Sequence, residues 1–240
     1  MNITEKKYIG EVVANDYRTA TVFKNHSIDF CCNGNRSIDE ACKSENIDSQ
    51  QLINELNEVL NDTSEKAVGF NHWPLDLLAD YIEKTHHRYC ERKINEIKPY
   101  LEKITKAHGE QHPELIEINE LFKETAGKMS VHMKKEELIL FPFIRKMTKV
   151  KSTGEALTAP KFGSVESPID IMKDDHNEEG ERFQRIRTLS QNYTVPEDGC
   201  ATYKVTFAML NEFEDDLHQH IHLENNILFP KSIALEKELA

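Results

Sequence analysis

One chemically suggestive pattern, His-x-x-x-Glu running on to Leu-Phe-Pro, occurs twice in the chain, with the copies 88 residues apart. Because residues four apart lie one above the other on a helix, each copy presents an imidazole and a carboxylate on one helix face. A fainter repeat, offset by 90 residues, adds one more histidine to each half. Such a set is typical of a centre with two metal ions in a helical bundle. The six candidate ligands are His86, His132, Glu136, His176, His220 and Glu224.

The two glutamates are the strongest argument for metal. Glu136 and Glu224 share their helix faces with apolar side chains, and burying a carboxylate costs several kcal/mol unless it is paired or metal-bound. No Lys or Arg lies on those faces, so metal cations are the simplest source of positive charge. Two metal-free His–Glu pairs bridging the helices are the alternative. Mixed imidazole and carboxylate ligands suit iron or manganese, with zinc an alternative, and two ions about 3.5–4 Å apart could share both carboxylates.

The neighbouring polar residues are expected to differ in role. His87 follows His86 and is expected to point sideways, although it stays an alternative ligand. The histidines two positions before and after His220 lie about 200° around the helix and are expected to face solvent. Asp216, one turn before His220, is either a partner that holds an imidazole or a residue at the edge of the core. The two histidines expected to face solvent are His218 and His222.

The elements that must position these residues are helices. Nine Gly and eight Pro in 240 residues, with 30 % charged and 38 % hydrophobic residues, favour an all-α fold. We expect a small N-terminal helical domain followed by a four-helix bundle. The bundle helices are expected from Pro74 to a kink or end at Pro99, from about Pro113 to about Met147, from Ile169 through Ile186 after an exposed crossover over Lys149 to about Val165, and from about Pro196 through Ile227.

The chain divides into residues 1–60, a linker over 61–73 and the bundle over 74–240. In the first part we expect one helix from Ile9 to about Asn25, a capping box that starts at Ser37, and a further helix after Asp48. Between them lie the adjacent cysteines Cys31 and Cys32. Their Cα atoms are about 3.8 Å apart across a trans peptide, below the disulfide range of roughly 4.4–6.8 Å. We therefore expect free thiols, which could also be no more than small packing groups in a tight turn.

Bulk properties exclude several classes of function. A net charge of −12 without a basic stripe argues against binding to nucleic acid. The N-terminus has no apolar stretch of signal-peptide length, and no apolar run could span a membrane. Five cysteines, an odd number without a disulfide pattern, fit a reducing compartment. We expect a cytoplasmic protein without membrane contact.

The doubled motif resembles the hemerythrin-like di-iron bundles. Together with the block Asp29-Phe-Cys-Cys-Asn-Gly, it is similar to the repair-of-iron-centres family of iron–sulfur cluster repair proteins. The resemblance covers nearly the whole chain and implies two iron ions, bridged by oxygen and carboxylate and held by the six ligands above. It makes Cys31 and Cys32 the signature thiols, with a role in redox chemistry or iron transfer. Oxygen-carrying hemerythrins use five histidines, and this chain offers four well-placed ones, which argues against oxygen carriage.

The resemblance also implies a function. Family members protect iron–sulfur clusters damaged by nitric oxide or peroxide, with iron supplied from the di-iron site. The implied partners are damaged iron–sulfur proteins and small ligands such as nitric oxide or oxygen, and a homodimer is an open alternative. Two other classes of function stay open: an enzyme that reduces nitric oxide or peroxide, and a sensor of oxygen or nitric oxide.

Overall fold

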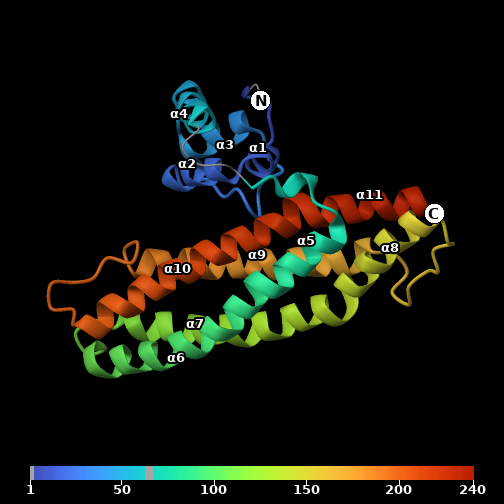
Figure 1. Cartoon of the computed structure of the whole chain (residues 1–240). Coiled ribbons are helices and arrows are strands. Elements are labelled where there is room, and N and C mark those ends of the chain that lie inside the picture. Colours follow the sequence, from blue (N-terminus) through green and yellow to red (C-terminus); the bar gives the residue numbers. More distant parts are fainter. Residues whose placement is uncertain (1–2, 63–67) are drawn as a thin grey trace.

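The computed structural model describes residues 3–62 and 68–240, which form helices and no β-strand. Within these residues, four long helical rods build an up-and-down bundle, and a small helical domain packs against one side of it (Figure 1). The small domain lies over the place where α10 passes into α11 (Figure 1). The prediction of an all-α fold with a small domain followed by a four-helix bundle is confirmed.

Three of the four rods are interrupted by a π-helical turn. Such a turn inserts one extra residue and rotates everything that follows on the helix. The rods are α5 (Leu75–Tyr81), η3 (Ile82–His87) and α6 (Arg88–His108); α7 (Glu114–Lys135), η4 (Glu136–Leu140) and α8 (Phe141–Thr153); α9 (Glu166–Leu189); and α10 (Ala201–Leu223), η5 (Glu224–Leu228) and α11 (Phe229–Leu239).

Two helices run beyond their expected ends. A kink or an end was expected at Pro99, and the end is excluded because helix α6 runs through the proline to His108. Pro99 lies on the exposed face, so water can reach the carbonyl of Asn95, which loses its backbone donor. The second rod continues to Thr153, six residues beyond the expected end at Met147. The crossover is shorter for that reason, and it ends at a buried Val165.

Two apolar clusters fill the bundle, one on each side of a polar middle layer. In the cluster that reaches toward α6, the ring of Phe213 lies 5.5 Å from that of Phe122 and 5.6 Å from that of Phe183. The other cluster contains residues from α5, α8 and α11, such as Leu78 and Ile144. Complete burial of each such side chain is worth about 1.5–3 kcal/mol. The stable apolar layers therefore enclose the layer of histidines and glutamates.

The N-terminal domain consists of short helices. Where one helix was expected between Ile9 and Asn25, the chain is broken at Asp16, whose extended backbone and side-chain cap start a new turn. The capping box at Ser37 and the helix start after Asp48 are confirmed. The elements are α1 (Ile9–Asn15), η1 (Tyr17–Thr19), α2 (Ala20–Asn25), α3 (Ile38–Glu45) and α4 (Ser49–Asn61).

The segment between the two parts was expected to be a linker over residues 61–73. Residues 63–67 of it lie outside the described residues. The rest is not a free tether, because η2 (Phe70–His72) buries Phe70, whose ring centroid lies 4.9 Å from that of Trp73 and 5.1 Å from that of Tyr81. These rings fix the start of the first rod.

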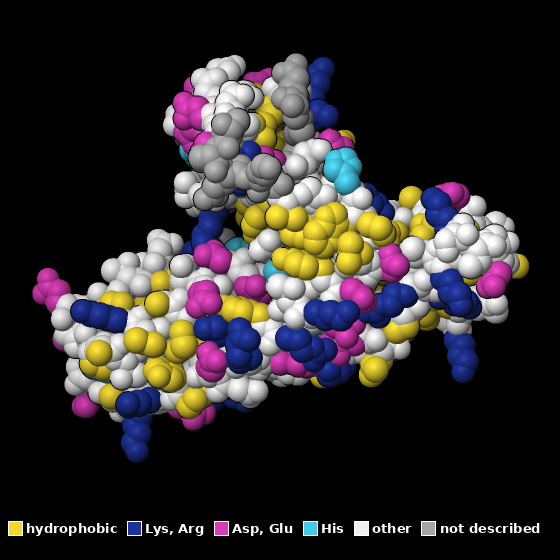
Figure 2. Space-filling model, in the orientation of Figure 1, with side chains coloured by type: hydrophobic (Ala, Val, Ile, Leu, Met, Phe, Trp, Pro, Cys, Tyr) yellow, Lys and Arg dark blue, Asp and Glu magenta, His cyan; other side chains and the backbone are white. Residues whose placement is uncertain are grey.

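The visible surface agrees with the charge pattern of the sequence. Lys and Arg side chains alternate with Asp and Glu on this face of the bundle, and no continuous basic stripe crosses it (Figure 2). Among the described residues, no helix is both long and apolar enough to cross a membrane.

Candidate metal centre

The two repeated motifs build equivalent corners of one site. In each copy the histidine lies in the last turn of an α-helix, at His132 of α7 and His220 of α10, and the glutamate four residues on begins a π turn. Glu136 and Glu224 are both fully buried. Each proline of the Leu-Phe-Pro tripeptides lies in the first turn of the helix that follows, where its missing N–H costs little.

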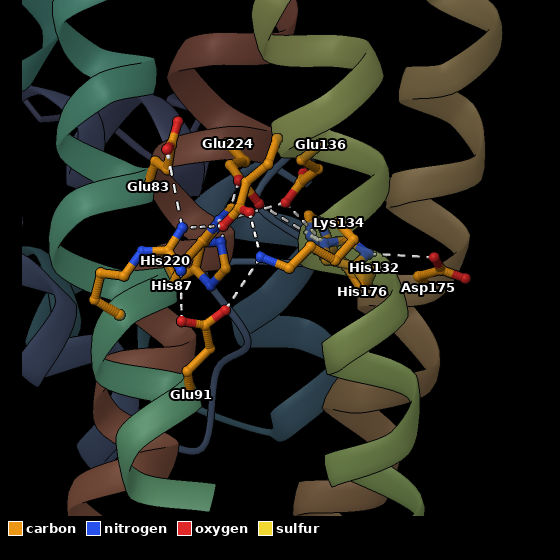
Figure 3. A network of polar contacts seen from close by, with 12 residues as sticks. Glu83, His87, Glu91, His132, Lys134, Glu136, Asp175, His176, His220 and Glu224 are labelled. Carbon is orange, nitrogen blue, oxygen red and sulfur yellow. Dashed lines mark hydrogen bonds and ion pairs between the residues drawn. The ribbon is translucent and has the colours of Figure 1, made fainter.

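Imidazole nitrogens and carboxylate oxygens from all four rods converge (Figure 3). His176 Nε2 lies 3.1 Å from His132 Nε2 and 3.1 Å from Glu224 Oε2. His220 Nε2 lies 3.1 Å from Glu224 Oε1, and His132 Nε2 lies 3.3 Å from Glu136 Oε2. The structure therefore brings together five of the six ligands predicted from the sequence.

The sixth corner is occupied by His87. Its Nε2 lies 3.3 Å from Glu136 Oε2, and two groups of buried bundle residues each have donor atoms within 4.8 Å of one another. His86 belongs to neither group, so the prediction that placed it among the ligands differs from the geometry. The π turn gives the reason, because one inserted residue moves the inward position from His86 to its neighbour. The two groups are His87, Glu136, His220 and Glu224, and His132, Glu136, His176 and Glu224.

Several of these buried atoms form no hydrogen bond of good geometry, although some lie at ion-pair distance from another side chain of the site. They include both carboxylate oxygens of Glu136, Oε2 of Glu224, and Nε2 of His87. Leaving a buried polar atom unsatisfied costs about 1–3 kcal/mol, and more when the group is charged. The donor set of four imidazoles and two carboxylates fits divalent or trivalent transition-metal cations, and the unsatisfied atoms are the ones that such cations would use.

Without cations, protons balance the charge of the site. Burial by itself would raise the pKa of Glu224, but His220 and His176 hold that pKa well below its usual range. Burial would lower the pKa of His132, yet the Glu136 carboxylate raises it to about 10. The carboxylates thus stay charged beside the protonated imidazole of His132, and metal binding by His132 would displace that proton.

Carboxylates outside the ligand groups accept hydrogen bonds from the Nδ1 atoms of two candidate ligands, His132 and His87. His132 Nδ1 lies 3.2 Å from Asp175 Oδ2, and the pKa of Asp175 is lowered to about 2, chiefly by His132. His87 Nδ1 lies 3.1 Å from Glu137 Oε1. Such partners fix the ring orientation and tautomer of metal-binding histidines. Sequence reasoning missed both, although each stands next to a ligand in the chain, and adjacency to a ligand was the available signal.

Asp216 takes the first of its two expected roles, because it holds an imidazole, that of His86. Its Oδ1 lies 3.0 Å from Nδ1 of His86. The His86 ring stacks parallel to that of His220 at 5.8 Å, and its buried Nε2 has no partner. Asp216 also borders a cavity of about 490 Å³ between the N-terminal domain and α10. His86 therefore lies beside the centre, on the side that faces this cavity.

The prediction that His218 and His222 face solvent was wrong. They do point out of the bundle, but the N-terminal domain covers that face, and both rings lie 6.0 Å from the ring of Phe30. Burial lowers the pKa of His222 to about 3, so its imidazole is neutral. A sequence pattern alone could not reveal this cover, because the covering domain is distant in the chain.

The two cysteines lie at the same junction. Cys31 is buried and Cys32 is half-buried, with their sulfur atoms 3.9 Å apart and both thiols free. The backbone amides of both donate to Asp29 Oδ1, at 3.0 and 2.9 Å. Cys32 Sγ lies 3.5 Å from the carbonyl oxygen of His176. The thiols therefore adjoin the backbone of a candidate ligand instead of lying remote from it.

Comparison with known proteins agrees with this architecture. Residues 5–60 match the model of ScdA_N, a domain of unknown function (DUF542), and residues 78–232 match the hemerythrin HHE cation-binding domain. The chain is 32 % identical over 232 residues to the iron–sulfur cluster repair protein ScdA of Staphylococcus haemolyticus, which covers 95 % of this chain and 99 % of that protein.

A second group of relatives is equally extensive. The iron–sulfur cluster repair protein YtfE of Yersinia pestis is 30 % identical over 223 residues, which covers 91 % of this chain and 93 % of the relative. Both parts of the chain, their order and nearly their full length are thus shared with these proteins. The chain therefore belongs to the family of ScdA and YtfE iron–sulfur cluster repair proteins, in which a hemerythrin HHE cation-binding domain follows the N-terminal domain along the chain.

Proposed function

We propose that the bundle holds two iron ions in a single centre. One ion would be bound by His87 and His220, the other by His132 and His176, and the two carboxylates would be shared between them. The observation that carries this proposal is the pair of four-residue groups that have both glutamates in common. The shared ligands are Glu136 and Glu224.

Iron suits this donor set better than softer or harder cations. Nitrogen and carboxylate ligands without thiolate favour iron or manganese, and two imidazoles with two shared carboxylates leave positions open on each ion. Iron bound there would be a redox-active cation with ligand positions that are open to exchange. The role of this chain's own residues is to hold the ions with few donors, to fix the imidazole rings through Asp175 and Glu137, and to keep bulk water out.

In this proposal the protein supplies iron to damaged iron–sulfur proteins. The names of its relatives, which are iron–sulfur cluster repair proteins, support the repair part of that role. The position of Cys32 Sγ against the His176 carbonyl supports a part for the thiols, because thiolates are good ligands for iron on its way to a cluster. Damaged iron–sulfur proteins would then be the partners, and iron would be the cargo.

The test measures iron transfer and the recovery of enzyme activity in one experiment. The full chain, loaded anaerobically with ⁵⁷Fe, is mixed with an iron–sulfur enzyme whose cluster has been destroyed by nitric oxide. The proposal predicts recovery of enzyme activity in proportion to the ⁵⁷Fe that appears in its cluster. Recovery with unlabelled iron only, or steady consumption of nitric oxide without transfer of ⁵⁷Fe, would instead identify the chain as an enzyme or an accessory factor.

A further inference from the structure

Each half of the centre has one histidine outside the His-x-x-x-Glu motif, His87 in one half and His176 in the other. The two are held at equivalent positions but by different chemical groups. In each half, the residue directly after the shared glutamate contacts the Nδ1 atom of the histidine. Glu137 Oε1 lies 3.1 Å from His87 Nδ1, and Asn225 Oδ1 lies 2.9 Å from His176 Nδ1. A carboxylate thus holds one imidazole, and a neutral amide holds the other. The repeat is symmetric in position and asymmetric in chemistry.

The amide can do something that the carboxylate cannot, because it also donates. Asn225 Nδ2 donates to the carbonyl oxygen of Cys31 at 3.2 Å, while its Oδ1 accepts from His176. One side chain therefore connects the cysteine turn of the N-terminal domain to an imidazole of the centre. Glu137 instead contacts Arg88 and Lys134 within the bundle.

The next residue strengthens the same junction. Asn226 Nδ2 donates to the carbonyl oxygen of Phe30 at 3.1 Å, and its side chain fits against two glycines. A Cβ atom would lie 2.4 Å from Asn226 Oδ1 if added to Gly10, and 2.7 Å if added to Gly34. The N-terminal domain is therefore shaped to receive this π turn. At the equivalent position of the other repeat, Leu138 is 73 % exposed and is not covered in this way.

We propose that Asn225 is a positioning residue that couples docking of the cysteine domain to the ion held by His132 and His176. While the domain is docked, the Cys31 carbonyl orients the amide, and the amide orients His176. When the domain moves away, Asn225 loses the carbonyl that orients it, so its amide no longer holds His176 in a fixed orientation, and the other half of the centre is unaffected. Loss of such a partner weakens metal binding by roughly 10- to 100-fold. This inference rests on the proposed two-ion centre and assigns its regulation.

The coupling must work in both directions. If docking strengthens metal binding by some factor, metal binding strengthens docking by the same factor. Iron loading should therefore protect the half-buried Cys32 from alkylation, since its sulfur lies in the docked interface. This second readout needs no activity assay and can also be measured on the iron-free protein.

The decisive experiment uses three variants of the full chain. For each, removal of the two irons by a ferrous chelator is followed with time, and Cys32 alkylation is followed by peptide mass spectrometry. Asn226→Leu disturbs docking without touching a ligand, and should speed removal of one iron roughly tenfold while raising alkylation. Asn225→Asp keeps an acceptor for His176 but loses the donor to Cys31, so alkylation should rise without faster iron removal. Leu138→Asn, at the equivalent position of the other repeat, should change neither rate.

The outcomes separate this inference from the function it rests on. Should Asn226→Leu fail to fold, Gly10→Ala disturbs the same contact from the other side, with Gly127→Ala as its control because nothing lies near that position. If the unaltered chain holds two irons but Asn226→Leu or Gly10→Ala raises Cys32 alkylation and changes both removal rates equally, or neither, the coupling is refuted and the centre stands. If the unaltered chain does not hold two irons, the proposed centre itself falls.

Discussion

At the scale of single residues, the choice between two adjacent histidines decides how the centre is built. His87 Nε2 faces Glu136, and its Nδ1 faces Glu137, which mirrors His176 between Glu224 and Asn225. This symmetry favours His87 as the ligand and leaves its neighbour outside the two groups.

Substitution of each histidine in turn tests this assignment. We expect His87→Ala to lose one of two irons, since it removes one of only two imidazoles on that ion. His86→Ala should keep both irons, because its ring only stacks on that of His220 at 5.8 Å. Iron analysis of the two purified variants is the measurement. Full occupancy in His87→Ala together with loss in His86→Ala would reverse the assignment.

A second residue-scale prediction concerns the exposed thiol of Cys200. A hydrogen bond with His108, whose Nε2 lies 3.3 Å from the sulfur, lowers the pKa of Cys200 to about 7. Its alkylation rate should therefore reach half of its plateau near pH 7 and stay high at more alkaline pH. Burial raises the pKa of Cys42 and of Cys90, so both should react only at higher pH. Peptide-resolved alkylation between pH 5 and 10 measures this, and His108→Ala should move the Cys200 midpoint upward.

At the scale of elements, π turns explain both what the sequence predicted and what it could not. The His-x-x-x-Glu spacing identified the second and fourth rods, because those four ligands precede or begin their turns η4 and η5. The first rod differs, because its π turn η3 ends at His87 itself, and the extra residue of that turn shifts the inward position by one residue. Neither the repeat offset by 90 residues nor apolar periodicity at α-helical spacing can reveal such an insertion, so both selected His86. The possible helix end at Pro99 was wrong for a different reason, since the exposed position of this proline was not visible from the sequence.

Removal of the ions should destabilise these same elements. Ligands that bind only the folded chain stabilise it by about 4 kcal/mol at 1,000 times their dissociation constant, so chelation should lower Tm by roughly 8–16 °C for a chain of this size. Calorimetry of the loaded and chelated full chain measures the difference. The Glu136→Gln, Glu224→Gln double variant should show a much smaller response to chelation. An unloaded chain as stable as the loaded one would mean that the site does not support the bundle.

At the scale of the whole molecule, the N-terminal domain is a cover placed beside the centre. It buries His222, brings Cys32 against the His176 backbone, and contacts η5 through Asn225 and Asn226. The sequence indicated the domain and its cysteines but not its place on the bundle. Contacts between segments almost 200 residues apart follow from shape and hydrogen bonding, and no spacing within either segment encodes them.

Replacing both cysteines should separate iron storage from repair. Neither sulfur belongs to the two ligand groups of the bundle, because both lie in a separate group with Asp29, so the Cys31→Ser, Cys32→Ser double variant should keep two irons in the bundle and a normal helix content. It should nevertheless lose most of its ability to reactivate a cluster protein damaged by nitric oxide. Both assays must be run on one preparation. Complete reactivation by the double variant would limit the cysteines to packing.

The most direct test of the account is the iron content of Glu136→Ala beside that of His87→Ala, both loaded anaerobically with the unaltered chain as the reference. If Glu136 is shared by both ions, its removal takes a donor from each, and iron should fall from two per chain to well below one. His87→Ala should retain about one, because the group built on His132 and His176 is left complete. Retention of a full iron by Glu136→Ala, at the same level as His87→Ala, would contradict a single centre with shared carboxylates.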